Sequence, residues 1–193
     1  MNDIRVAVIV GSLREESYTR LASKEALAAA NDFDGVETDR IDLRGLDLPV
    51  FDADNGDGGD AEALRERVRA ADAVILATPV YHASFSSALK NALDYCGFDE
   101  FENTTVGLLC VAGGSFPTTT LDQLRSVCRA LNAWVVPHQV AIPRVRNVFE
   151  DGEVVDDDVR ERIDTLGRRM VEYANIEPDP RTMEAKQNVG AED

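Results

Sequence analysis

The stretch VAVIVGSLREESYTRLA, residues 6–22, predicts a strand, a tight loop and the start of a helix. The apolar run ends at Gly11, and a helical pattern begins at Ser17, which suits the N-cap. Ser12 adds a hydroxyl group and Arg14 a planar cation. Free N–H groups and the helix dipole favour an anion at such a junction. The stretch therefore predicts a phosphate-binding loop, although a serine-capped helix with an arginine that binds nothing would show the same pattern.

The rest of the chain repeats this alternation of strands and helices. Strands are predicted over residues 4–10, 36–42, 73–78, 104–112 and 133–141. Helices are predicted over residues 17–30, 61–71, 84–96 and 119–131, and a last one, capped by Asp156 or Asp157, ends near residue 174. Strands that alternate with helices form βαβ units and one parallel sheet. The predicted fold class is α/β, with a five-stranded parallel sheet in the doubly wound order 2-1-3-4-5.

Two further loops fall at the edge of this sheet where ligands bind, beyond the carboxyl ends of the strands. TPVYHASFSS, residues 78–87, follows the third strand and supplies the aromatic ring of Tyr81 and the polar tip of His82. AGGSFP, residues 112–117, follows the fourth strand, and its two glycines let a flat group approach the backbone. Each loop alone is also a common strand-to-helix connection. With the first loop, they predict a site for a phosphorylated planar ring, for which FMN is the candidate.

The chain is acidic along its whole length. It has 193 residues, with 36 Asp and Glu against 20 Lys and Arg, and a formal net charge of −16. The acids are 21 Asp and 15 Glu, and the bases are 17 Arg and 3 Lys. A dispersed excess of Asp with little Lys predicts a halophilic protein, because concentrated salt screens its self-repulsion. The lack of a basic stripe argues against nucleic acid as a partner.

Length and composition predict one domain in a reducing compartment. The domain is expected over residues 1–175, with a polar tail over residues 176–193. No run of about 18 apolar residues predicts a membrane span, and no signal peptide is visible. Cys96, Cys110 and Cys128 are widely spaced, which predicts no disulfide framework and favours the cytoplasm.

Motifs for other chemistries fail at identifiable positions. The acidic loop of residues 52–60 has Asp57 where a calcium loop needs glycine, and Ala63 where it needs glutamate. The first loop is neither GxxxxGK[ST] nor GxGxxG, and it lacks the cysteine of a low-molecular-weight phosphatase. No GxSxG elbow is present. The sequence therefore predicts no metal site and no catalytic acid, base or nucleophile.

The loops resemble motifs of a known family, the NADPH-dependent FMN reductases. GSLREESYTRLA, residues 11–22, resembles GSLRxxSxNRxLA, and TPVYHASFSSALKNALDY, residues 78–95, resembles TPEYNxSxSGxLKNAxDW. AGGSFP lies where the family has its third flavin loop. The resemblance covers roughly residues 4–175 and implies a flavodoxin-like three-layer sandwich. The family also includes azobenzene, quinone and chromate reductases.

The resemblance implies which residues hold FMN. Those that would hold the phosphate are Ser12, Arg14, Ser17 and Thr19. Those that would line the flavin ring are Pro79, Val80, Tyr81 and His82, and those that would border its other end are Gly113, Gly114 and Ser115. The chain departs from the family pattern at Thr19, Val80, His82, Ser87 and Tyr95, where the family often has Asn, Glu, Asn, Gly and Trp. Its PVYHASFS form is more similar to the sulfonate-associated branch, which uses flavin partly as a substrate.

The implied activity is hydride transfer from NADPH or NADH to flavin N5, with electrons passed on to flavin, quinone, azo or metal-oxyanion acceptors. The cofactors carry this chemistry, so no catalytic side chain is required. A flavodoxin-type FMN electron carrier, which oxidises no nicotinamide, is the alternative. Arg14, Arg20 or Arg144 could meet the 2′-phosphate of NADPH, and the sequence selects none of them. The resemblance also implies a homodimer or homotetramer, with the apolar stripe of residues 88–96 as a possible interface.

Overall fold

The computed structural model describes residues 4–115, 117–174 and 176. The strands are β1 (Ile4–Val10), β2 (Val36–Asp42), β3 (Ala73–Pro79), β4 (Thr105–Val111), β5 (Trp134–Ile142), β6 (Phe149–Glu150) and β7 (Glu153–Val154). The α-helices are α1 (Tyr18–Asn31), α2 (Ala61–Arg69), α3 (Ser87–Asp94), α4 (Phe98–Phe101), α5 (Thr118–Ala130) and α6 (Asp157–Glu172). Two short 3-10 helices are η1 (Leu43–Gly45) and η2 (Val145–Asn147). The polar tail predicted over residues 176–193 lies outside the described residues, apart from residue 176.

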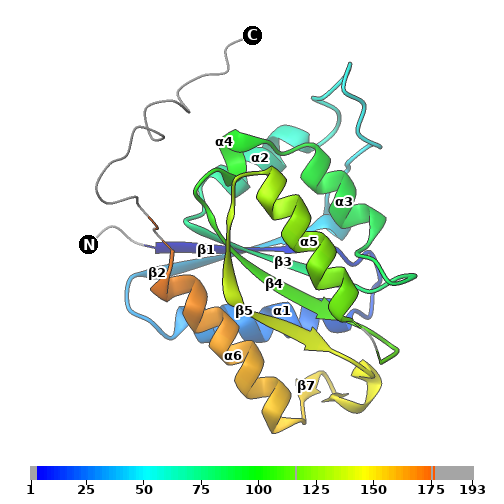
Figure 1. Ribbon diagram of the computed structural model, residues 1–193, viewed down its shortest axis with the longest axis vertical. Coiled ribbons are helices and arrows are strands. Elements are labelled where there is room, and N and C mark those ends of the chain that lie inside the picture. Colours follow the sequence, from blue (N-terminus) through cyan, green and yellow to red (C-terminus); the bar gives the residue numbers. More distant parts are fainter. Residues whose placement is uncertain (1–3, 116, 175, 177–193) are drawn as a thin grey trace.

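The protein has three layers, with a parallel sheet between two layers of helices (Figure 1). The strand order is β2-β1-β3-β4-β5, which confirms the predicted fold class. Helices α1 and α6 pack on one face of the sheet, and α2 to α5 pack on the other (Figure 1). The pairs β1·β3 and β3·β4 are parallel, so the loops after these strands emerge at the same edge. This edge holds the loops that the sequence singled out.

The structure differs from the predicted elements mainly in short segments. Helix α3 begins at Ser87 instead of residue 84, because Ser86 is its N-cap and accepts a hydrogen bond from the backbone N–H of Leu89 at 3.1 Å. The four-residue helix α4 and the hairpin β6–β7 were not predicted. The hairpin turns at Asp151 and Gly152, both with positive φ.

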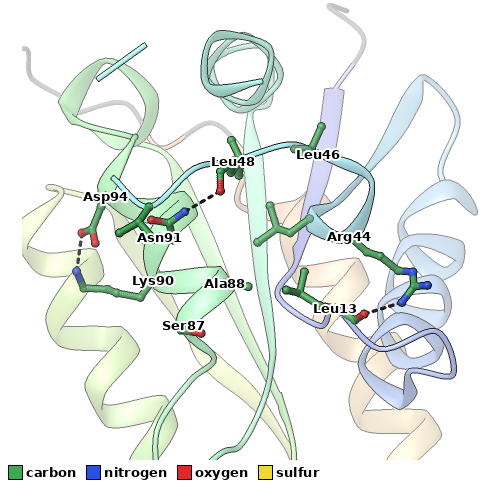
Figure 2. A pocket seen from close by; sticks show the side chains of 11 residues that line it. Leu13, Arg44, Leu46, Leu48, Ser87, Ala88, Lys90, Asn91 and Asp94 are labelled. Atoms are coloured by element: carbon green, nitrogen blue, oxygen red, sulfur yellow. Dashed lines mark hydrogen bonds and ion pairs between the residues drawn. The ribbon is translucent and has the colours of Figure 1, made fainter. Parts of the chain in front are cut away.

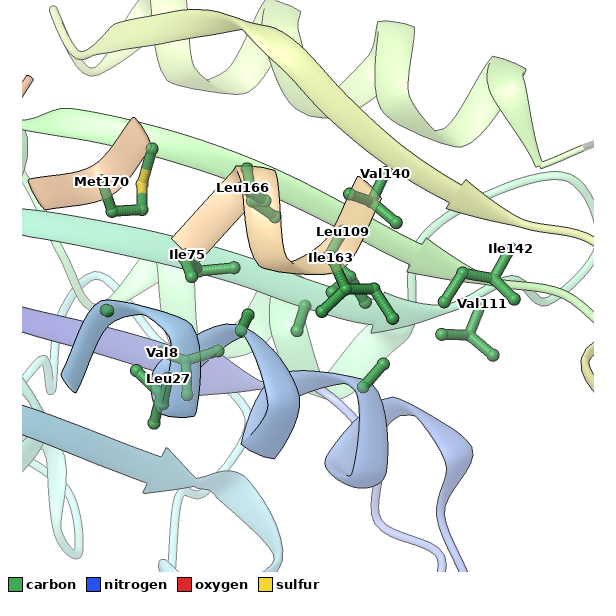
Figure 3. Packing of buried hydrophobic residues seen from close by; sticks show 14 of the residues in the cluster. Val8, Leu27, Ile75, Leu109, Val111, Val140, Ile142, Ile163, Leu166 and Met170 are labelled. Atoms are coloured by element: carbon green, nitrogen blue, oxygen red, sulfur yellow. The ribbon is translucent and has the colours of Figure 1, made fainter. Parts of the chain in front are cut away.

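Both faces of the sheet are covered by buried apolar side chains. On the α1 and α6 face, side chains of the three central strands meet those of the two helices (Figure 3). The labelled examples are Val8, Ile75 and Leu109 from the strands, Leu27 from α1, and Ile163, Leu166 and Met170 from α6. The opposite core includes Leu89, Ala92, Leu93 and Cys96 of the α3 region. The apolar stripe of residues 88–96 therefore packs mainly into the protein's own core, not on its surface.

Helices α1 and α6 touch through a glycine. A Cβ atom added at Gly167 would lie 2.1 Å from the carbonyl oxygen of Ala26 and 3.0 Å from Cβ of Ala29. A Cβ atom never lies that close to a backbone oxygen, so only glycine permits this crossing. The close approach lets α1 and α6 form one layer under β1, β3 and β4.

The three cysteines are buried thiols. Cys96, Cys110 and Cys128 are free, and burial raises the pKa of each to about 12. A thiol with such a pKa is a poor nucleophile at neutral pH. All three belong to the core on the α2 to α5 face of the sheet. No described helix is long and apolar enough to span a membrane.

Candidate active site

A cavity of about 320 Å³ lies beyond the carboxyl ends of β1, β3 and β4. Three loops and the segment after β5 form its walls. The lining residues are Ser12, Arg14, Glu16, Ser17, Tyr18, Thr19, Pro79, Val80, Tyr81, Val111, Gly113, Gly114, Val145 and Arg146. The cavity thus brings together the site residues predicted from the sequence, except His82 and Ser115.

Hydroxyl groups gather at the α1 end of this cavity. Ser12 and Thr19 are each 2% exposed, and neither side chain forms a hydrogen bond with another described residue. Neither hydroxyl oxygen is fully enclosed without a partner, so both are open to the cavity that they line. Ser17 is the N-cap of α1, and its Oγ accepts a hydrogen bond from the backbone N–H of Arg20 at 3.2 Å. The first turn of α1 contains no acidic residue. Hydroxyl groups beside a helix N-terminus can donate hydrogen bonds to an anion, so this end of the cavity is suited to bind a negatively charged group.

The first loop is held from outside the cavity by two arginines. Arg44 donates a hydrogen bond to the carbonyl oxygen of residue 13 at 2.7 Å. Arg20 donates to the carbonyl oxygens of residues 14 and 15 at 3.1 and 2.8 Å, and Asp42 holds Arg20 at 2.6 Å. Neither arginine lines the cavity, so the carbonyl dipoles of residues 13–15 are engaged outside it. The sequence did not reveal this bracing, because Asp42 lies 22 residues from Arg20.

Gly11 brings the first loop against α3. The turn does not require its conformational freedom, because Gly11 has no positive φ. Instead, an added Cβ would lie 2.8 Å from Cβ of Leu89 and 2.9 Å from Oγ of Ser86. The Ser86 hydroxyl donates to the carbonyl oxygen of Gly11 at 2.6 Å while it caps α3. One serine, missed by the sequence analysis, thus joins the loops after β1 and β3.

The second loop contains a tight turn with an unusual backbone. The N–H groups of Tyr81 and Ser84 donate to each other's carbonyl oxygens at 2.9 and 3.0 Å. His82 and Ala83 between them have φ of 50° and 63°, which is the pattern of a type I′ turn. Both residues are exposed, and His82 does not line the cavity, whereas the half-exposed ring of Tyr81 does.

Helix α5 holds this turn in place. The side chains of Thr119 and Gln123 donate to the carbonyl oxygen of Ala83 at 3.3 and 3.4 Å. Gln123 also accepts a hydrogen bond from the Ser84 hydroxyl at 2.6 Å. Left-handed backbone costs an alanine about 1–2 kcal/mol, so a conformation of this kind persists where its surroundings enforce it.

The third loop presents backbone to the cavity. Added Cβ atoms at Gly113 and Gly114 would meet no atom within 4 Å, and neither residue has a positive φ. The protein's own packing therefore does not require glycine at these positions. Ser115 lies outside the cavity lining, where its Oγ accepts a hydrogen bond from Nε of Arg144 at 3.3 Å.

Replacing Gly113 by valine is expected to change the free energy of unfolding by less than about 0.5 kcal/mol, since the new side chain meets open space. The same side chain would narrow the cavity, so the Kd for FMN is expected to rise about tenfold or more. Thermal melts and flavin titrations measure the two effects. Gly45→Val is the matched control, because Gly45 also faces open space but lies outside this cavity. A variant that binds FMN as tightly as this control would contradict the expectation.

The cavity lining also contains residues that the sequence analysis missed. They are Tyr18 of α1 and, in the segment after β5, Val145 and Arg146. The predicted site was limited to the loops after the first, third and fourth strands. The ring of Tyr18 packs on that of Phe149, with ring centres 5.5 Å apart. This contact brings the segment after β5 to the N-terminal end of α1. No sequence signal marked Arg146 in advance.

A second cavity, of about 520 Å³, lies on the other side of the first loop (Figure 2). Its apolar lining includes Leu13, Leu46, Leu48, Val50 and Ala88. Its polar side chains are largely engaged within the protein. Lys90 pairs with Asp94 at 2.5 Å, and Asn91 donates to the carbonyl oxygens of Leu48 and Pro49 at 3.5 and 2.8 Å. We therefore take the smaller cavity, with its unpaired hydroxyls, as the candidate active site.

Comparison with protein families decides the identity of this arrangement. A family model described as NADPH-dependent FMN reductase matches residues 4–147, which include β1 to β5 and the loops that line the cavity. The chain belongs to the NADPH-dependent FMN reductase family. As a member, it is an oxidoreductase that uses FMN and a nicotinamide nucleotide.

Two curated relatives agree with this assignment, and a solved structure shares the fold. An NADPH azoreductase of Bacillus sp. strain OY1-2 is 34% identical over 158 residues, which cover 80% of this chain and 84% of that protein. A probable NADPH:quinone oxidoreductase 1 of Oryza sativa subsp. japonica is 32% identical over 174 residues, or 83% and 86% of the two chains. The apo form of the NADH:FMN oxidoreductase EmoB shares the fold, with a TM-score of 0.72 and 22% identity over 92% of this chain and 94% of that one.

Proposed function

We propose that this FMN reductase oxidises NADPH or NADH with FMN seated in the 320 Å³ cavity. The observation that carries the proposal is that Ser12 and Thr19, two otherwise buried residues, line the cavity with hydroxyl groups that have no partner among the described residues and are open to the cavity. Their unmet hydrogen bonds fit a phosphate group. Azo or quinone compounds, named for the two curated relatives, are the proposed final acceptors beside free flavin.

The proposed roles follow the position of each residue in the cavity. Those assigned to the FMN phosphate are Ser12, Arg14, Ser17 and Thr19. Those assigned to the ring are Pro79, Val80, Tyr81, Gly113 and Gly114. His82 and Ser115 lie outside the lining, so we assign them supporting roles, His82 in the turn beside Tyr81 and Ser115 in the third loop.

When bound, FMN supplies a flavin ring that accepts a hydride from the nicotinamide at N5. The chain's own residues bind and orient the reactants. The α1 end offers hydroxyl and guanidinium donors to the phosphate, while Tyr81 offers an aromatic face. Gly113 and Gly114 leave space at the third loop. The bracing of residues 13–15 by Arg20 and Arg44 keeps the cradle formed before a ligand enters.

The decisive experiment measures nicotinamide oxidation with and without added flavin. The protein is purified in concentrated KCl, its bound flavin is measured by absorbance, and NADPH or NADH is supplied with and without FMN. Consumption only with added FMN would identify flavin as a released substrate. Consumption by the yellow protein with an azo dye or quinone would identify FMN as a bound cofactor. A yellow protein that oxidises neither nucleotide under any condition would contradict the proposal and leave the flavodoxin-type carrier.

We propose a homo-oligomer that associates around the 520 Å³ cavity. Val50 and Leu13 on its wall are 88% and 54% exposed, which is unusual for apolar side chains. A second copy of the chain would cover them, and a homodimer or homotetramer is expected by sedimentation equilibrium. Val50→Asp should shift the protein toward monomer, and a variant that sediments like the wild type would contradict this interface.

We propose that the protein is halophilic and cytoplasmic. The net charge of −16 and the three free, buried cysteines support this setting. Because salt screens repulsion between exposed carboxylates, the free energy of unfolding is expected to rise by several kcal/mol between about 0.1 and 2 M KCl. Denaturant melts at several KCl concentrations measure it. Full stability in dilute buffer would contradict the halophilic assignment.

A further inference from the structure

Arg146 is a cation in the cavity wall with no partner. It lies in η2, two residues beyond the end of β5, and lines the cavity with Arg14; both arginines are exposed residues. No described residue accepts a hydrogen bond or forms an ion pair with either guanidinium group. The other arginines near the site are engaged, Arg20 with Asp42 and Arg144 with Ser115. Two arginines without a described side-chain partner therefore line one cavity in a chain with a net charge of −16.

Packing contacts fix the backbone of Arg146 beside the N-terminus of α1. The N–H of Val145 donates to the carbonyl oxygen of Ala112 at 3.0 Å, which ties η2 to the third loop. Three residues after Arg146, the ring of Phe149 packs on Tyr18 of α1. The segment is therefore held at both ends, and Arg146 enters the cavity from the wall that carries neither Arg14 nor the three hydroxyls.

The charged residues that line the cavity carry a net positive charge, which favours the binding of an anion. Glu16 is the acidic residue in the lining, and it forms no ion pair with Arg14 or Arg146. Two like charges that face one cavity repel each other, and an anion between them removes this repulsion. A guanidinium group binds a phosphate through two parallel N–H···O bonds. The geometry thus favours a phosphate group as the shared partner.

We propose that Arg146 binds a nucleotide phosphate monoester in the cavity that it lines together with Arg14. This role rests on the proposed function of the cavity. The phosphate monoester is either the 5′-phosphate of FMN or the 2′-phosphate of NADPH, since both present the same chemistry. In the first case Arg146 determines flavin affinity, and in the second it determines the choice between NADPH and NADH.

The test compares Arg146→Gln and Arg146→Lys with Arg129→Gln. Arg129 is exposed in the last turn of α5 and does not line the cavity. Replacing it by glutamine therefore changes the net charge by the same amount as Arg146→Gln, but away from the cavity. Kd values for FMN and riboflavin are measured on the flavin-free protein, and KM values are measured for NADPH and NADH. A lost charge-assisted contact is expected to weaken binding about tenfold to a hundredfold. The lysine variant, which keeps the charge, should recover part of this loss.

The outcomes separate the two sources of phosphate. If Arg146→Gln raises the Kd for FMN but not for riboflavin, the 5′-phosphate is the partner. If it raises the KM for NADPH but not for NADH, the 2′-phosphate is the partner. Values equal to those of Arg129→Gln in both assays would overturn the role of Arg146 and leave the proposed function intact. A wild-type protein that binds no FMN would overturn the proposed function first.

Discussion

Replacing Gly167 by alanine should lower the free energy of unfolding by about 3 kcal/mol or more. In an ordinary helix the same change is stabilising by about 0.5–1 kcal/mol, because alanine is the better helix former. Here the new Cβ would lie 2.1 Å from the carbonyl oxygen of Ala26, a backbone atom that cannot rotate away. Helices α1 and α6 must then separate, which opens the core they form under the sheet. The steric effect therefore exceeds and reverses the effect of helix propensity.

Thermal and denaturant melts in concentrated KCl measure this loss. For a chain of this size, 3 kcal/mol corresponds to a decrease in Tm of about 6–12 °C. Gly45→Ala is the control, because its Cβ would meet no atom within 4 Å. A Gly167→Ala protein that melts at or above the wild-type temperature would show that the two helices do not approach as closely as described.

Replacing Gly11 by alanine should impair both folding and flavin binding. The added Cβ would lie 2.8 Å from Cβ of Leu89, 2.9 Å from Oγ of Ser86 and 3.1 Å from the carbonyl oxygen of Ala77. These atoms belong to the start of α3 and to β3, so the first loop must shift. Overpacking of this kind costs about 1–3 kcal/mol. The shift also displaces Ser12, and the Kd for FMN is expected to rise at least about tenfold, since hydrogen bonds to a charged group depend on position.

Two further variants separate the causes of this loss. Ser86→Ala removes the hydrogen bond to the Gly11 carbonyl and the cap of α3 without adding bulk. It should lower the free energy of unfolding by about 1–2 kcal/mol. Gly45→Ala adds the same methyl group in open space outside the flavin cavity and should keep the wild-type stability and FMN affinity. If Gly11→Ala bound FMN and melted like Gly45→Ala, the close packing of the first loop on α3 would be refuted.

Much of the site could be predicted because its position depends on the order of strands and helices along the chain. Each apolar run became a strand of the sheet, and the loops after three neighbouring strands necessarily meet at one edge. Hydroxyls, a helix start and Arg14 in the first loop then pointed to a phosphate. Ser17 could be identified as a cap, and Asp156 as one of two candidates beside Asp157, because an N-cap needs a short polar side chain at a helix start.

Other features depend on contacts between distant residues and could not be predicted. Arg20 was a candidate for a nucleotide phosphate, but Asp42 and two loop carbonyls engage it. The turn at His82 and Ala83 has positive φ without glycine or asparagine, so no turn signal marked it. Helix α4 is one turn long, too short for a periodic pattern, and Glu100 within it pairs with Arg69 of α2.

The first loop is a wall common to both cavities. Leu13 lines the larger cavity, while Ser12 and Arg14, its neighbours in the chain, line the smaller one. A molecule that binds in one cavity and restricts the first loop removes conformational entropy from that loop. A molecule that then binds in the other cavity has less of this entropy to remove. If flavin binds in the smaller cavity and the chain associates around the larger one, as proposed, the two binding equilibria are linked through this wall, and the linkage is reciprocal. Whatever factor a flavin nucleotide imposes on self-association, self-association imposes on the affinity for that nucleotide.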